Sequence, residues 1–136
     1  MSTALQANYT WRAATEADAA ACAALIRAFD AAACPEDSTG WTPGDILADW
    51  EWLDPATNTW LAVAPDGTLA GYATLTDRGA GSLTADGYVH PQHEGRGIGT
   101  ALLRATEARS REIAAKQPAD QPTTLINNTV ATSVRA

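Results

Sequence analysis

The sequence has 136 residues, which is the length of one domain. Sixteen acidic residues oppose nine basic ones, so the formal net charge is −7 at pH 7. Because nucleic acids and anionic membranes are bound through basic patches, we expect neither as a partner. The sequence contains no stretch of about 18 apolar residues, and its first ten residues lack a basic start and an apolar run. We therefore expect neither a transmembrane segment nor a signal peptide.

Two cysteines, Cys22 and Cys34, fall within one predicted helix. A helix rises about 1.5 Å per residue, which places the two residues roughly 18 Å apart and too far from each other for a disulfide. We interpret both as reduced thiols, consistent with a cytoplasmic protein.

The first half of the chain predicts a short strand followed by two helices. Residues Tyr9–Ala13 alternate as in a strand. Thr15 is a good N-cap for a helix that should end just before Pro35. Thr42-Pro43 begins a second helix, which we expect to close at Asp54-Pro55.

Three tryptophans, Trp41, Trp50 and Trp52, cluster around this second helix. Such side chains suit packing in the core and at its rim. The alternative, an aromatic wall that covers a substrate pocket, stays open at this point.

The second half predicts three strands, a glycine-rich turn, a long helix and a last strand. The strands are expected at Trp60–Ala64, Leu69–Leu75, Leu83–Val89 and Thr124–Asn127, and the helix at about 97–116. Consecutive strands favour antiparallel pairing, whereas a strand–helix–strand crossover gives a parallel pair. The sequence therefore predicts an α+β fold of three layers, with a mixed and mostly antiparallel sheet.

The turn between the third of these strands and the helix contains alternating glycines at Gly95, Gly97 and Gly99. A strand, a glycine turn and a helix N-terminus together present unpaired N–H groups at the positive end of a helix dipole, which suits phosphate. A plain tight turn or close helix packing would explain the glycines equally well. The spacing differs from a Rossmann fingerprint, and no Gly-Lys-Ser/Thr follows, which excludes a P-loop.

The string Tyr-Val-His-Pro-Gln-His-Glu-Gly-Arg-Gly-Ile-Gly-Thr-Ala-Leu-Leu at 88–103 resembles the coenzyme A motif of the GCN5-related N-acetyltransferases, the GNAT superfamily. Pro91, Gly97, Gly99 and the pair Leu102-Leu103 match the motif in register. The order of the predicted elements resembles that of the family over the whole chain. The resemblance implies the acyl-CoA N-acyltransferase fold, with acetyl-CoA as the acyl donor and a primary amine of a small molecule or peptide as the acceptor.

The resemblance also implies where coenzyme A would bind. Backbone groups of Gly87, Tyr88 and Val89 would contact the pantetheine arm and the acetyl carbonyl. The pyrophosphate would be held by the amides of Gly95, Arg96, Gly97, Ile98, Gly99 and Thr100. No metal is implied.

A general base is less evident from the sequence. Asp86, three residues before the strand end, is our candidate, with His90 and His93 behind it. A structural role for the carboxylate and a surface role for both histidines are the alternatives.

Two features depart from the family pattern. Glu94 stands where the family usually has Arg or Gln, and a carboxylate beside a pyrophosphate is unfavourable unless it points outward or pairs with Arg96. The family continues with a helix and two more strands. We therefore interpret residues 1–136 as a single N-acetyltransferase domain that is C-terminally incomplete.

These departures favour further alternatives. The alanine-rich start and the Val-His-Pro string are similar to the N-terminal halves of tandem acetyltransferases of the mycothiol synthase type. The chain would then be a non-catalytic acyl-CoA-binding or structural half-domain of a larger protein. A homodimer that completes the sheet through its last strand is the remaining alternative.

Overall fold

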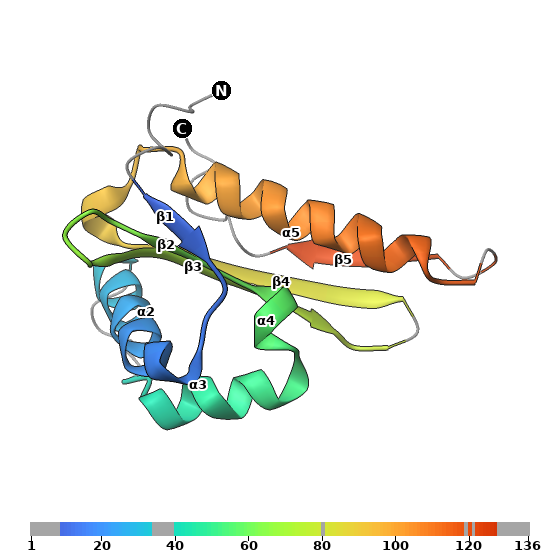
Figure 1. Ribbon diagram of the computed structural model, residues 1–136, viewed down its shortest axis with the longest axis horizontal. Helices are drawn as coiled ribbons and strands as arrows, with labels where there is room; N and C mark the ends of the chain where they lie inside the picture. Colours follow the sequence, from blue (N-terminus) through green and yellow to red (C-terminus); the bar gives the residue numbers. More distant parts are fainter. Residues whose placement is uncertain (1–8, 34–39, 80, 119, 121, 128–136) are drawn as a thin grey trace.

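The computed structural model describes residues 9–33, 40–79, 81–118, 120 and 122–127. Five strands form one sheet whose spatial order, β1-β2-β3-β4-β5, follows the order in the chain (Figure 1). The strands are β1 Thr10–Arg12, β2 Thr59–Val63, β3 Leu69–Asp77, β4 Ser82–Val89 and β5 Thr124–Asn127. β1 to β4 pair antiparallel, and β5 runs parallel to β4. The predicted mixed sheet is confirmed.

Helices cover both faces of this sheet. The α-helices are α2 Ala19–Ala33, α3 Pro43–Asp49, α4 Pro55–Asn58 and α5 Ile98–Ala115. Short 3-10 turns lie at η1 Glu16–Asp18, η3 Trp50–Trp52 and η4 Pro91–His93. Figure 1 shows α2 and α3 on one side of the sheet and α5 on the other. The predicted three-layer architecture is thus confirmed.

Each face of the sheet carries its own core. On the side of α2 and α3, Cys22, Ile26, Ile46 and Tyr72 are buried together. On the side of α5, small side chains of the sheet leave room for the helix: Ala62, Ala70 and Ala73 pack against Ile98 and Leu102. The alanines let α5 lie close to the central strands, which fixes where its N-terminus can be.

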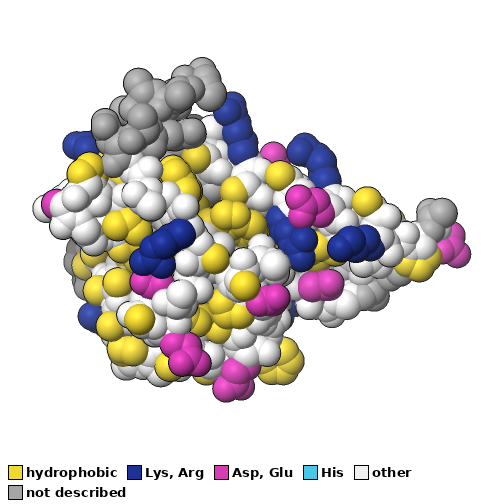
Figure 2. All heavy atoms as spheres, in the orientation of Figure 1, with side chains coloured by type: hydrophobic (Ala, Val, Ile, Leu, Met, Phe, Trp, Pro, Cys, Tyr) yellow, Lys and Arg dark blue, Asp and Glu magenta, His cyan; other side chains and the backbone are white. Residues whose placement is uncertain are grey.

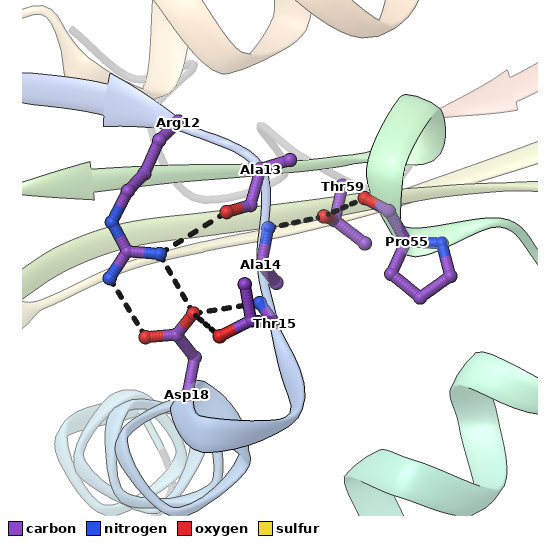
Figure 3. A network of polar contacts seen from close by, with 7 residues as sticks. All are labelled: Arg12, Ala13, Ala14, Thr15, Asp18, Pro55 and Thr59. Carbon is purple, nitrogen blue, oxygen red and sulfur yellow. Dashed lines mark hydrogen bonds and ion pairs between the residues drawn. The ribbon is translucent and has the colours of Figure 1, made fainter.

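The N-cap predicted at Thr15 is confirmed, but the cap is larger than expected (Figure 3). The Asp18 carboxylate accepts hydrogen bonds from the Thr15 backbone at 2.8 Å and the Thr15 hydroxyl at 3.1 Å. Arg12 of β1 donates two further bonds of 2.8 Å to the same carboxylate. The helical segment therefore begins with the 3-10 turn η1 and continues as α2.

The predicted end of the second helix was wrong. α3 ends at Asp49 and continues as η3, whereas Asp54-Pro55 begins the separate short helix α4. Asp54 accepts a hydrogen bond of 3.0 Å from the Ala56 backbone. An Asp at the N-cap followed by Pro at the first helical position is a start signal, because Pro lacks the N–H that would be unpaired there.

Cys22 is a free thiol buried in the core, and burial raises its pKa to about 12. It is therefore an unreactive core side chain. Cys34, the predicted helix end before Pro35 and the helix expected from Asn128 lie outside the described residues. Within the described part of the chain, no helix combines the length and apolar character needed to cross a membrane.

Candidate functional site

The glycine turn leads into α5 through two left-handed residues. Gly95 has φ 80° and Gly97 has φ 85°, a region that residues with a Cβ rarely adopt. Gly97 is the N-cap of α5, and no side chain caps the helix there. The first backbone bond of the helix is donated by Ala101 to the Gly97 carbonyl at 3.0 Å. By helix geometry, the amides of the residues between them lack an intrahelical partner, at the positive end of a helix of 18 residues.

The strand that precedes this turn has one edge that, beyond Ala85, shows no strand pairing with the described residues, and we call it the open edge. His90 donates a backbone bond of 2.8 Å to Ala70, which extends the β3–β4 ladder to the end of β4. Because backbone groups alternate between the two edges of a strand, those of Tyr88 point to β3 and those of Gly87 and Val89 point away from it. On that second edge, pairing with the described part of β5 ends at Ala85. The open edge therefore runs directly toward the glycine turn.

A residue that sequence reasoning missed ties the turn to the sheet. The hydroxyl of Tyr9, directly before β1, lies 2.9 Å from Nδ1 of His93. Nη1 of Arg96 donates to the same hydroxyl at 3.3 Å. Tyr9 and His93 are 84 positions apart in the chain, and no local pattern connects them. This contact is a product of the fold.

The two candidate histidines both have structural partners. Nδ1 of His90 accepts a hydrogen bond of 3.1 Å from the Gln92 backbone and so caps η4. His93 contacts Tyr9, and burial, followed by the nearby charges of Arg96 and His90, lowers its pKa. Both side chains therefore help to shape the approach to the turn.

Glu94 is exposed. In the part of the chain that the structure describes, the ion pairs are Arg12–Asp18 and Arg109–Glu112, so Glu94 does not pair with Arg96. Of the two ways to accommodate a carboxylate near a phosphate site, the outward orientation is the one that the structure supports.

Asp86 lies on β4 opposite Thr74 of β3. Alternation along β4 places it on the same face as Tyr88, whose ring contacts Phe29 of α2 and is stacked on Tyr72. Asp86 therefore faces the α2 and α3 layer, whereas the glycine turn continues into α5 on the other side of the sheet.

Sequence reasoning missed the other carboxylates near Asp86. The pKa of Tyr88 is raised to about 12, first by burial and then by the charges of Asp86, Asp30 and Asp49. The pKa of Asp49 is also raised, first by desolvation and then by Asp86, while Arg78 opposes this shift. Carboxylates from α2, α3 and β4 thus all act on Tyr88, and Asp86 also acts on Asp49, so this face is a favourable environment for a cation.

Next to these carboxylates, the surface is hollowed between α3 and the β3–β4 hairpin. The lining residues of this hollow of about 550 Å³ are Asp49, Trp52, Thr76, Asp77 and Arg78. A hollow of about 420 Å³ on the other side of Asp49 and Trp52 is lined by Trp41, Asp45, Ala48, Asp49 and Trp52. In Figure 2, acidic side chains gather along the rim where Figure 1 places α3.

The tryptophans differ in their positions. Trp50 is buried and donates a hydrogen bond of 2.9 Å from Nε1 to the Tyr72 hydroxyl, so it belongs to the core. Trp52 is 76% exposed, and together with Trp41 it lines the hollow. An exposed indole beside carboxylates can contact a cationic group through its ring face.

The mixed sheet, the helices on both of its faces and the glycine turn before α5 define a class of protein, namely one with the acyl-CoA N-acyltransferase fold. The family model "Acetyltransferase (GNAT) family" matches residues 20–129. The chain belongs to this family.

Solved structures agree with this assignment. A GCN5-related N-acetyltransferase from Sphaerobacter thermophilus is 36% identical, with a TM-score of 0.80 over 88% of this chain and 38% of that chain. The yncA putative acetyltransferase from Salmonella typhimurium, with its cofactor acetyl-CoA, is 23% identical, with a TM-score of 0.64 over 79% of this chain and 65% of that chain. A phosphinothricin acetyltransferase from Sinorhizobium meliloti, in complex with acetyl-CoA, is 20% identical, with a TM-score of 0.63 over 77% and 60%. The chain thus spans about two fifths to two thirds of the lengths of these proteins.

Proposed function

We propose that this protein is an acetyl-CoA-dependent N-acetyltransferase that moves an acetyl group to a primary amine of a small molecule or peptide. One observation carries the proposal: the open backbone edge of β4 leads, through η4 and the glycine turn, to the uncapped N-terminus of α5. An extended chain with amide groups can pair along such an edge, and a phosphate can bind at such a helix end. Coenzyme A contains both parts in this order.

On the side of the acyl donor, backbone groups would bind and orient acetyl-CoA. Gly87 and Val89 direct their N–H and C=O groups toward the open edge, where they would pair with the pantetheine arm. The amides of Ile98, Gly99 and Thr100, with those of the preceding turn residues 95–97, would hold the pyrophosphate. Their alignment with the helix dipole stabilises negative charge without a basic side chain.

On the acceptor side, the hollow beside Asp49 and Trp52 would receive the amine as its ammonium form. Asp86 is the proposed base: it removes a proton, and the neutral amine attacks the thioester carbonyl. A C–N bond forms, the C–S bond breaks, and coenzyme A leaves as a thiolate that takes up the second proton, which the nitrogen loses as it becomes an amide. Backbone N–H groups at the end of β4 stabilise the oxyanion that forms between these events.

A second candidate function is acyl-CoA binding without catalysis, as in one half of a tandem acetyltransferase of the mycothiol synthase type. This alternative is supported by the coverage of only 38% of the Sphaerobacter protein. It predicts coenzyme A binding without turnover by the chain alone. A third outcome, turnover only by a homodimer, would appear as activity that rises more than linearly with protein concentration.

The first experiment is titration calorimetry with acetyl-CoA, followed by a thiol-release assay over a panel of primary amines. Gly95 allows a matched pair of variants, because a Cβ built there meets no heavy atom within 4 Å. Asp and Asn both tolerate left-handed backbone and have the same shape, but only Asp adds a charge.

We expect Gly95→Asp to weaken acetyl-CoA binding about tenfold relative to Gly95→Asn at low salt, since a like charge near a phosphate costs about 1.4 kcal/mol. The difference should shrink as salt is added. No binding by the wild-type chain would overturn the proposal. Equal affinities for the two variants would show that the phosphate binds elsewhere.

A further inference from the structure

Tyr9 connects the start of the sheet to the turn that follows β4. The residue is 8% exposed, and its ring meets the ring of His93 edge-on, at a centroid distance of 5.8 Å and an angle of 74°. Its hydroxyl lies 2.9 Å from Nδ1 of His93 and 3.3 Å from Nη1 of Arg96. One phenol thus holds residues on both sides of Gly95.

The direction of these hydrogen bonds follows from the groups themselves. A guanidinium can only donate, so Arg96 donates to the phenol oxygen. The phenol keeps its own proton, and we assign it as the donor to Nδ1 of His93, with the ring proton of His93 on Nε2. The result is a chain of two hydrogen bonds from Arg96 through Tyr9 to His93, each with one donor and one acceptor.

The glycine turn needs such an external restraint. Gly95 and Gly97 both have positive φ, and a Cβ at Gly95 would meet no heavy atom within 4 Å, so packing does not restrict the backbone at that position. A glycine backbone also has more conformations to lose on ordering than any other residue. The Tyr9 hydroxyl restricts the segment from outside, at His93 and at Arg96.

We propose that Tyr9 is a positioning residue for phosphate binding: it holds the turn in the shape in which the amides at the start of α5 converge. This inference rests on the proposed function, because the bound group is the pyrophosphate of acetyl-CoA. Restricting the turn before the ligand arrives reduces the entropy that binding must otherwise overcome.

The test is Tyr9→Phe, which keeps the ring and its contact with His93 but removes the hydroxyl. Two donors are compared: acetyl-CoA, and S-acetyl-pantetheine, which lacks the pyrophosphate. We expect the Kd and KM for acetyl-CoA to rise about fivefold, the change expected for the loss of about 1 kcal/mol of hydrogen bonding, with kcat unchanged. kcat/KM for S-acetyl-pantetheine should not change, because that donor does not use the turn.

Two results would overturn the inference. Equal losses with both donors would indicate general destabilisation, and an unchanged or lower Kd for acetyl-CoA would show that the hydroxyl does not position the turn. His93 provides the matched control: His93→Ala removes the acceptor, whereas His93→Asn places an amide oxygen near the position of Nδ1. We expect His93→Ala to behave as Tyr9→Phe does and His93→Asn to restore affinity; failure of the Asn variant to do better than the Ala variant also counts against the inference.

Hydrogen exchange without ligand separates this inference from the proposed function. In Tyr9→Phe, amides of residues 94–100 should exchange faster than in the wild-type chain, while those in β2 and β3 should keep their rates. Unchanged exchange at the turn would overturn the inference even if acetyl-CoA binds. Conversely, the turn could exchange faster in Tyr9→Phe while the wild-type chain fails to bind acetyl-CoA. That result would support the restraint by Tyr9 and overturn the proposed function.

Discussion

Gly71 of β3 and Ile98 of α5 are in such close contact that a Cβ atom at residue 71 would lie 2.6 Å from Cγ2 of Ile98. The same atom would lie 3.4 Å from Cδ1 of Leu102. Ile98 is the first residue of α5, directly after Gly97. The missing side chain on β3 therefore sets how closely the phosphate-binding end of the helix approaches the sheet.

We expect Gly71→Ala to lower the free energy of unfolding by about 1–3 kcal/mol, the usual cost of overpacking a core. The methyl group would push against a β-branched side chain, whose χ1 angle is restricted in a helix. Urea unfolding measures the effect. In a double-mutant cycle, Ile98→Ala should relieve part of the cost of Gly71→Ala, and strictly additive effects of the two substitutions would contradict the contact.

The Arg12–Asp18 pair predicts a pH dependence of stability (Figure 3). Hydrogen bonding to Arg12, more than any other cause, lowers the pKa of Asp18 from 3.8 to about 2. A folded pKa below the unfolded value means that the stabilisation is present above pH 3.8 and is lost as pH falls through about 2. Since Arg12 is 44% exposed, solvent screening limits the stabilisation to about 1 kcal/mol.

The measurement for this pair is urea unfolding of Asp18→Asn and wild type at pH 7 and at pH 2. The variant should be less stable by about 1 kcal/mol at pH 7, and the difference should vanish near pH 2. Glu94→Gln, which removes an equal charge at an exposed site, is the control and should show little difference at either pH. A constant deficit of Asp18→Asn across this range would mean that the carboxylate charge is not the cause.

His93 should be neutral at pH 7, with its proton on Nε2. Burial, then Arg96 and His90, lower its pKa below 6.5, whereas Asp66 acts in the opposite direction. Its neutral state therefore contributes stability above pH 6.5 that is lost as pH falls through the folded pKa. Imidazole ¹H–¹⁵N spectra over a pH titration report both the tautomer and the pKa.

In Tyr9→Phe, the donor to Nδ1 is absent, so we expect the pKa of His93 to move upward. A proton on Nδ1 in the wild-type chain at pH 7 would contradict the assigned direction of the hydrogen bonds.

Asp86→Asn tests the proposed base. The amide keeps the shape of the carboxylate but cannot accept a proton, so we expect kcat to fall by about 10² or more with KM for acetyl-CoA unchanged. Asp49→Asn is the matched variant: it should raise KM for the amine, by removing attraction to a cation, and leave kcat near the wild-type value. Wild-type kcat in Asp86→Asn would assign the base to another group.

Local signals in the sequence predicted most of the fold, because each acts over a few residues. β5 has its predicted bounds, Thr124–Asn127, and the start of α5 lies within one residue of the prediction. The capping residues Thr15 and Thr42 also act as predicted. Asp54-Pro55 carries the same kind of local signal, but it marks the start of α4 and not the predicted end of the preceding helix.

The features of the candidate site also divide into those that local sequence patterns predicted and those that only the tertiary structure decided. The glycines at 95, 97 and 99, together with the preceding strand, predicted a helix start that exposes its amides, since backbone geometry there depends on residue type. Tertiary structure alone decided three further features: the Tyr9–His93 contact, the joint action of Asp30, Asp49 and Asp86 on Tyr88, and the outward position of Glu94. Each depends on residues far apart in the chain or on which face of the sheet a helix covers, and no short pattern specifies either.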